Sequence, residues 1–366
     1  MKLCIIPGDG IGVEVIRAAQ RVLRALPLEV EMVEAAAGWG TFQETGTALP
    51  EATLEAARSS DAILFGAVAS PSHPVPGYRS PIVALRRALD LYANIRPVGA
   101  AAAPVRSVSR EGGQNLVDLV VVRENTEGLY AGRERLEDNG NTAIAERVIT
   151  RRGSERIART AFELARERAT RLGPRKSESG QRKVTIVHKA NILRLTDGLF
   201  REVALEVARD YPEIAVEELL VDTAAMHLAQ SPERFGVIVT TNLFGDILSD
   251  VACIHGGGLG LASSANIGDQ YALFEPVHGA APDIAGRGIA NPLAALGCLV
   301  LLLEWKERKQ PQRGDATSLS QMLREAIGAT LREGPHTSDL GGDATTEEVT
   351  SAIIEKLRKA PEPETP

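Results

Sequence analysis

Short apolar runs alternate with amphipathic stretches along most of this 366-residue chain. Five runs have the length and composition of buried strands, at residues 3–6, 62–65, 116–122, 183–187 and 237–239. Four stretches have the period of helices, at residues 13–26, 50–59, 154–170 and 199–211. Strands that are apolar on both faces need helices on both sides of the sheet. The alternation therefore predicts an α/β fold with a largely parallel sheet.

Length, charge and cysteine content narrow the class of protein. A chain of 366 residues buries a large core and is expected to form two domains or lobes. A net charge of -7 argues against nucleic acid or an anionic membrane as the main partner. Three widely spaced cysteines exclude a disulfide framework and indicate a reducing, cytoplasmic compartment. The longest apolar stretch, residues 293–303, is too short for a membrane span, and residues 360–366 are expected to be disordered.

Two aspartates follow the strand predicted at residues 237–239. If a helix begins near Gly245, Asp246 and Asp250 lie on one helix face about 6 Å apart. Such a pair repels itself unless a cation lies between the carboxylates, and an all-oxygen site suits Mg²⁺ or Mn²⁺. Acidic residues in a first helical turn also satisfy free N–H groups and the helix dipole. From these residues alone, a metal site and a helix cap are equal alternatives.

Several arginines accompany predicted strand ends. Arg86 and Arg96 lie within residues 78–97, and Arg123 follows the strand at residues 116–122, where ligands of open α/β sheets bind. A guanidinium grips a carboxylate with two parallel hydrogen bonds, although a single arginine is more often a solvated surface charge. Only convergence of these arginines in space would make a carboxylate clamp.

A lysine and an aspartate follow two further apolar runs. Lys189 comes just after residues 183–187, and Asp222 comes after residues 219–220. A strand-end lysine near carboxylates is suited to act as a base, and Asp222 is suited to be a third oxygen ligand. An ordinary ion pair and a helix cap are the alternatives.

Two glycine-rich segments are candidates for nucleotide contact. The turn at residues 8–12 lacks a dinucleotide fingerprint because its third glycine would fall at Val13, so a ligand-facing turn and a structural turn are equal alternatives. Residues 275–292 are too apolar and irregular for a simple solvent loop. Small residues there let a flat ring lie against the backbone, and Asp283 is suited to bind a ribose diol and to repel a 2′-phosphate.

Taken in order, these segments resemble the metal-dependent β-decarboxylating dehydrogenases that act on isocitrate, 3-isopropylmalate, homoisocitrate or tartrate. The resemblance runs through Ile-Pro-Gly-Asp-Gly-Ile-Gly at residues 6–12, Arg-Glu-Asn-Thr-Glu-Gly-Leu-Tyr at 123–130, His-Lys-Ala-Asn at 188–191 and Asn-Leu-Phe-Gly-Asp-Ile-Leu-Ser-Asp at 242–250. It implies a non-Rossmann fold with a large cofactor-binding domain (1–98 and 257–359). The small domain (99–256) would carry the dimer interface. It also implies a homodimer with shared active sites, which could pair further into a tetramer.

The resemblance assigns roles to residues and favours the metal reading of the aspartates. Asp246, Asp250 and Asp222 are expected to hold Mg²⁺ or Mn²⁺, with Lys189 and Asp222 reaching in from the partner subunit. Lys189, assisted by Asp222, would be the base, and Tyr130 would protonate C3. NAD is expected along a set of residues from five segments: Ile11, Val68, Ala69, Ser70, Asn191, Glu275, His278, Gly279, Ala280, Ala281, Asp283, Ile284 and Asn291.

The implied substrate is a hydroxy tricarboxylate. The contacts implied for it are Ser70, Ser80, Val83, Arg86, Arg96, Arg123, Tyr130, Lys189 and Asn191. Ser-Pro-Ile-Val-Ala-Leu-Arg at residues 80–86 is most similar to homoisocitrate dehydrogenases. The expected reaction is the NAD-dependent conversion of homoisocitrate to 2-oxoadipate and CO₂ in the α-aminoadipate route to lysine. Val83 would also admit an apolar substituent. The alternatives are an isocitrate or a 3-isopropylmalate dehydrogenase, and a non-catalytic regulatory subunit.

Overall fold

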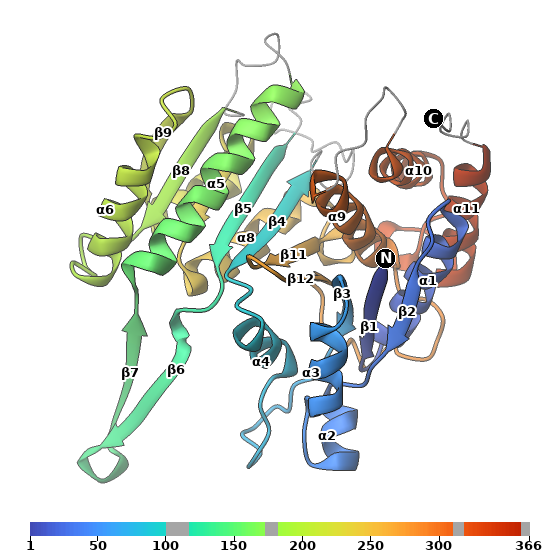
Figure 1. Ribbon diagram of the computed structural model, residues 1–366, viewed down its shortest axis with the longest axis horizontal. Coiled ribbons are helices and arrows are strands. Elements are labelled where there is room, and N and C mark those ends of the chain that lie inside the picture. The colour runs from blue at the N-terminus through green and yellow to red at the C-terminus, as the bar shows by residue number, and fades with distance from the viewer. Residues whose placement is uncertain (100–116, 173–181, 310–317, 360–366) are drawn as a thin grey trace.

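The computed structural model describes residues 1–99, 117–172, 182–309 and 318–359 (Figure 1). Its strands are β1 Lys2–Gly8, β2 Glu31–Glu34, β3 Ala62–Ala67, β4 Ala93–Gly99, β5 Asp118–Glu124, β6 Gly128–Glu137, β7 Thr142–Val148, β8 Lys183–His188, β9 Ala215–Leu220, β10 Val237–Thr240, β11 Ser263–Ile267 and β12 Ala272–Pro276. Its α-helices are α1 Gly12–Ala25, α2 Trp39–Thr45, α3 Glu51–Arg58, α4 Pro81–Ala88, α5 Arg151–Leu172, α6 Thr196–Ala208, α7 Val221–Gln230, α8 Asn242–Cys253, α9 Leu293–Lys309, α10 Leu319–Glu333 and α11 Thr346–Lys359.

Ten strands form one sheet in the order β2-β1-β3-β12-β11-β4-β5-β10-β8-β9. Neighbouring strands are parallel except at the centre, where β12-β11, β11-β4 and β4-β5 are antiparallel. The predicted α/β fold with a largely parallel sheet is confirmed. Strands β6 and β7 form a separate hairpin that projects away from the sheet (Figure 1).

Helices cover both faces of the sheet. On β5, Val120 and Val122 pack with α5 and α6, whereas Leu119 and Val121 pack with α7 and α8 on the other face. This alternation follows from the period of two in a strand. The strands at the other end of the sheet pack against α1, α9, α10 and α11 on one face and against α3 and α4 on the other. Continuous burial explains why the parallel strands are uniformly apolar.

All nine predicted strands and helices are present, with ends that shift by a few residues. The start expected near Gly245 was wrong, because α8 begins at Asn242, directly after the extended residue Thr241. Gly245 lies inside the helix, where an added Cβ would be 2.6 Å from the side chain of Arg123. This glycine therefore serves close packing rather than helix initiation.

The boundaries at residues 98/99 and 256/257 stay a prediction. The tail at residues 360–366 lies outside the described residues. Within the described ranges, no helix has both the length and the apolar character needed to cross a membrane.

Candidate active site

Arg123 lies near the end of β5 and is the most buried of the predicted site arginines, with 1% of its surface exposed. Its Nε donates to Oδ1 of Asn242 at 2.9 Å, and its guanidinium forms an ion pair with Asp246. Burial lowers the pKa of Arg123 to about 10, against the opposing effect of Asp246. The packing of α8 at Gly245 brings the aspartate and this buried cation together.

Asp246 and Asp250 project from the same side of α8 toward Arg96. The Arg96 guanidinium lies 3.3 Å from Oδ1 of Asp246 and 3.4 Å from Oδ1 of Asp250. Burial raises the pKa of Asp246, but Arg123, the Tyr130 hydroxyl and Arg96 outweigh it, so the pKa is lowered. Burial and the charge of Asp246 raise the pKa of Asp250 despite Arg96. The arginines therefore neutralise the negative charge of the Asp250 carboxylate only in part.

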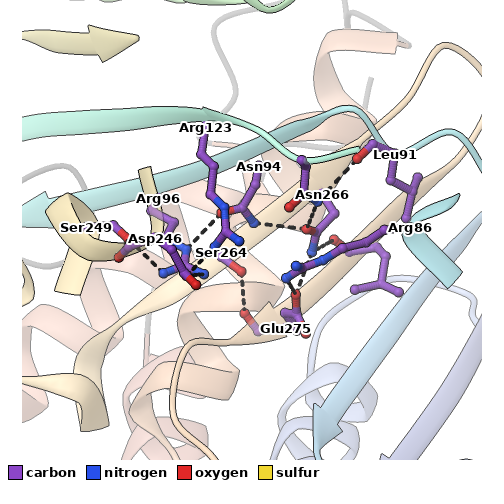
Figure 2. A network of polar contacts seen from close by, with 12 residues as sticks. Arg86, Leu91, Asn94, Arg96, Arg123, Asp246, Ser249, Ser264, Asn266 and Glu275 are labelled. Carbon is purple, nitrogen blue, oxygen red and sulfur yellow. Dashed lines mark hydrogen bonds and ion pairs between the residues drawn. The ribbon is translucent and has the colours of Figure 1, made fainter. Parts of the chain in front are cut away.

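Arg86 and Arg96 are linked by a buried chain of amides (Figure 2). Arg96 Nε donates to Oδ1 of Asn94 at 2.8 Å, and Nδ2 of Asn94 donates to Oδ1 of Asn266 at 2.9 Å. Nδ2 of Asn266 donates to Oε1 of Glu275 at 2.8 Å, and Nη2 of Arg86 donates to the same oxygen at 2.8 Å. Arg123 joins the same network through Asp246, so the three arginines lie in one polar network, and their role as a carboxylate clamp stays a prediction.

Sequence reasoning missed Asn94 and Asn266. Both are fully buried, in strands β4 and β11. Glu275 was expected only as a cofactor contact, yet it forms a buried ion pair with Arg86. A buried amide must have hydrogen-bond partners, but β4 and β11 were not among the predicted strands, so no local signal marked these two amides as buried.

Tyr130 lies next to the acidic pair. Its hydroxyl donates to Oδ2 of Asp246 at 2.5 Å, and the Arg123 guanidinium lies 5.1 Å from its ring centre. Burial and the hydrogen bond to Asp246 raise the pKa of Tyr130. The phenol is therefore kept protonated, as a proton donor must be.

Lys189 and Asp222 form an ion pair with each other, between the end of β8 and the first turn of α7. The backbone N–H of Lys189 donates to Oδ2 of the fully buried Asp197 at 2.6 Å, which fixes the chain at this point. The hydrogen bond from Lys189 lowers the pKa of Asp222. The ammonium is thus held beside an ionised carboxylate.

Asp246 and Asp250 suit a divalent cation but do not complete its ligand set alone. Their side chains are 32% and 60% exposed, so a hard cation has access to oxygen ligands. Among the described residues, no three His, Cys, Asp or Glu side chains are placed to hold one metal ion. Asp222 of the same chain therefore does not supply the third ligand.

The turn at residues 8–12 joins the segments expected to contact NAD. Gly8 and Gly10 have φ of +76° and +57°, and the Asp9 carboxylate accepts from the backbone N–H of Trp39, Gly40 and Ala69 at 2.7 to 2.9 Å. The backbone N–H of Ile11 donates to the carbonyl of Ala280 at 2.9 Å. The turn at residues 8–12 therefore contacts both the segment after β3 and the loop before α9.

This loop fits a planar group with hydrogen-bonding atoms. Nε2 of His278 is buried and has no hydrogen-bond partner in the described part of the chain. Next to it, a Cβ added at Gly279 would meet no atom within 4 Å. Asp283 is exposed, whereas the buried Asn291 donates to Asp339. The unpaired imidazole nitrogen beside open space is suited to a nucleotide ring.

The remaining predicted substrate residues lie in two places: Ser70, Ser80 and Val83 lie in or before α4, and Asn191 lies after β8. Ser80 precedes α4, and Val83 lies three residues before Arg86, on the same helix face. Ser70 is exposed in the connection from β3 to α4, and Asn191 is exposed just after β8. Asn191 therefore lies with Lys189, on the opposite side of β10 from Arg123.

Comparison with known proteins agrees with this geometry. The isocitrate/isopropylmalate dehydrogenase family matches residues 2–356. The chain is 51% identical to the isocitrate/homoisocitrate dehydrogenase of Thermus thermophilus and 48% identical to the homoisocitrate dehydrogenase of Methanocaldococcus jannaschii, over 98% of each chain. It is 46% identical to a 3-isopropylmalate dehydrogenase of Methanothermobacter thermautotrophicus, again over 98% of both chains.

A solved structure shows the same fold. The crystal structure of isocitrate dehydrogenase from Methylococcus capsulatus superposes with a TM-score of 0.83 at 42% identity, covering 98% of this chain and 99% of that one. The chain therefore belongs to the isocitrate/isopropylmalate dehydrogenase family and is a decarboxylating dehydrogenase.

Proposed function

We propose that the protein converts homoisocitrate to 2-oxoadipate and CO₂ with NAD and a divalent Mg²⁺ or Mn²⁺ ion, in the α-aminoadipate route to lysine. The observation that carries this proposal is the meeting of Arg96 and Arg123 with the Asp246 and Asp250 carboxylates, in one polar network with the Arg86–Glu275 ion pair. Three guanidinium groups match a substrate with three carboxylates, and the aspartates match a cation that such a substrate would chelate.

Each reacting proton has a residue to move it. After the Lys189 ammonium has released a proton to water through Asp222, the neutral amine takes the proton of the 2-hydroxyl, and Tyr130 donates a proton to C3 after CO₂ leaves. When bound, NAD accepts the hydride from C2, and the divalent ion draws electron density from the 2-oxygen. Arg86, Arg96 and Arg123 hold the carboxylates of the substrate in a fixed orientation. The buried amide chain fixes the relative positions of Arg86 and Arg96.

A homodimer with shared sites completes the ligand set. Among the described residues, no third carboxylate, histidine or cysteine joins Asp246 and Asp250, and Lys189 and Asp222 lie together at the surface, where a partner subunit could receive them. Large apolar side chains near α7 and α8 are exposed, including Met226 (47%), Ile247 (52%) and Ile254 (73%). Exposed apolar surface of this kind marks an interface. Asp222 of the partner subunit would then join Asp246 and Asp250.

The residues before Arg86 support homoisocitrate, but Val83 favours a second candidate. Val83 is half-buried on the Arg86 face of α4 and would pack against an apolar substituent, as in 3-isopropylmalate.

Asp283 supports NAD over NADP because a carboxylate repels a 2′-phosphate. Cys4, Cys253 and Cys298 are buried free thiols, which supports a reducing compartment such as the cytoplasm.

A substrate panel tests the proposal. Purified protein is assayed with homoisocitrate, isocitrate and 3-isopropylmalate, each with NAD or NADP, and with Mg²⁺, Mn²⁺ or EDTA. The highest kcat/KM is expected for homoisocitrate with NAD and metal, with no turnover in EDTA. A higher kcat/KM for either other substrate would replace the substrate assignment, and equal use of NADP would remove the role given to Asp283.

A further inference from the structure

A cavity of about 810 Å³ lies between α5 and α9, away from the arginines and aspartates of the candidate active site. Its floor is the sheet, and its walls are the facing sides of the two helices. In Figure 1, α5 and α9 lie in front of the central strands, and α8 lies behind them. The cavity and the active site are therefore on opposite faces of the same strands.

The alternation of side chains along β4 explains this arrangement. Ile95 and Pro97 line the cavity, whereas Asn94 and Arg96 point to the other face and join the polar network of the active site. In β11, Ala265 and Ile267 line the cavity, and Asn266 lies in the network. Successive residues of a strand point to opposite faces, so one sheet separates the two sites.

The floor of the cavity is apolar and aromatic. Val120, Ile95 and Ile267 lie beside the rings of Tyr92, Phe274 and Trp305. Cavities of 300 to 1,000 Å³ with such linings bind small molecules, whereas a stable protein partner buries a much larger surface. The dimensions therefore fit a small molecule with a flat apolar body.

The walls carry charges of both signs. Among the described residues, six basic and five acidic side chains line the cavity. Arg156 and Arg159 form ion pairs with Asp90, Glu155 and Asp210, which lie outside the lining. The ammonium of Lys309 lies 4.2 Å from the Trp305 ring centre, and no ion pair of Lys309 occurs among the described residues. An anionic group next to Lys309 would therefore meet a cation over an aromatic surface.

We propose that this cavity is a second ligand site, which binds a small aromatic or apolar molecule that carries an anionic group. Arg308 of α9 and Glu167 of α5 form an ion pair across it at 3.1 Å, so the two walls lie close together at its rim. The site is occupied independently of NAD, because the sheet separates it from the cofactor contacts.

The probe for the test is 8-anilinonaphthalene-1-sulfonate, an aromatic anion that becomes fluorescent in apolar surroundings. It is titrated into the full-length protein with and without saturating NAD and Mg²⁺. Saturable binding at one site per chain, with the same Kd in both cases, is expected. Displacement of the probe by NAD, or binding that does not saturate, would overturn the proposal.

A matched pair of variants locates the probe. Thr160 lines the cavity, and Thr170 is an exposed residue of the same helix that does not; each hydroxyl donates to the carbonyl four residues earlier. Thr160→Phe fills the cavity and should weaken binding by at least about tenfold, whereas Thr170→Phe should leave it within about twofold. Equal binding by both variants would place the probe elsewhere.

The anionic group is tested separately. Lys309→Gln should weaken binding of the sulfonate probe but not of uncharged N-phenyl-1-naphthylamine. Equal effects on the two probes would remove the anion from the proposal. If Thr160→Phe fails to fold, a crystal structure of the wild-type protein with the sulfonate probe decides the location, because density outside the α5–α9 cavity would refute it.

Discussion

Asn94 of β4 and Asn266 of β11 lie directly opposite each other in the antiparallel pairing, and Nδ2 of Asn94 donates to Oδ1 of Asn266 at 2.9 Å. Asn266 also accepts from Asn125 and donates to Glu275, each at 2.8 Å, and neither Asn94 nor Asn266 is exposed to solvent. A fully bonded buried amide fixes the positions of its partners. The two asparagines therefore hold Arg96 and Arg86 at a set separation.

Asn266→Ala should reduce both stability and catalysis. The change leaves buried donors on Asn94 and Asn125 without their acceptor, which costs about 2–4 kcal/mol of unfolding free energy. With the arginines free to shift, KM for the substrate should rise as well. Urea unfolding and steady-state kinetics measure the two effects. Asn141→Ala, at an exposed site on the hairpin, is the control and should change stability by less than about 0.5 kcal/mol. Unchanged kinetics in Asn266→Ala would deny the positioning role.

Gly245→Ala should destabilise the protein although alanine is the better helix former. In an open helix the change would stabilise by up to about 1 kcal/mol. Here the new Cβ would lie 2.6 Å from the Arg123 side chain, which must move and take Asp246 with it. Gly198→Ala in α6 is the control, since an added Cβ there meets no atom within 4 Å. We expect Gly198→Ala to be neutral or stabilising. A stable, fully active Gly245→Ala variant would show that α8 tolerates displacement.

The sequence was most informative where strands are parallel and buried on both faces. Strands β1, β3, β5, β8 and β10 were predicted because such strands are apolar throughout. The antiparallel strands β4, β11 and β12 were not, because Asn94, Asn266 and Glu275 interrupt their hydrophobic pattern. The same polar residues form the network of the active site. Local patterns also do not indicate that Arg86 pairs with Glu275, 189 positions away.

Asp246→Asn and Asp250→Asn should separate stability from metal binding. Asp246 is the ion-pair partner of the buried Arg123, so its neutralisation leaves an uncompensated buried cation and should cost about 3–5 kcal/mol. Asp250 is 60% exposed, and its loss should change stability in EDTA by less than about 0.5 kcal/mol. Both variants should lose Mn²⁺ affinity and turnover. Urea unfolding in EDTA and Mn²⁺ titration give the two quantities. Wild-type Mn²⁺ affinity in Asp250→Asn would show that Asp250 is not a metal ligand.

Mixing two inactive variants tests whether each active site is shared between subunits. Lys189→Met removes the proposed base, and Asp250→Asn removes a proposed metal ligand without disturbing Arg123. In a hybrid dimer with shared sites, one site takes Asp246 and Asp250 from the Lys189→Met subunit and Lys189 and Asp222 from the Asp250→Asn subunit. This site is intact. The other site carries both substitutions. Random pairing makes half of the dimers hybrid, so about one quarter of wild-type activity should return after co-refolding or co-expression. Mixing each variant with itself is the control and should restore nothing. If base and metal ligands came from one chain, no pairing could produce an intact site, and the mixture would stay as inactive as its parts.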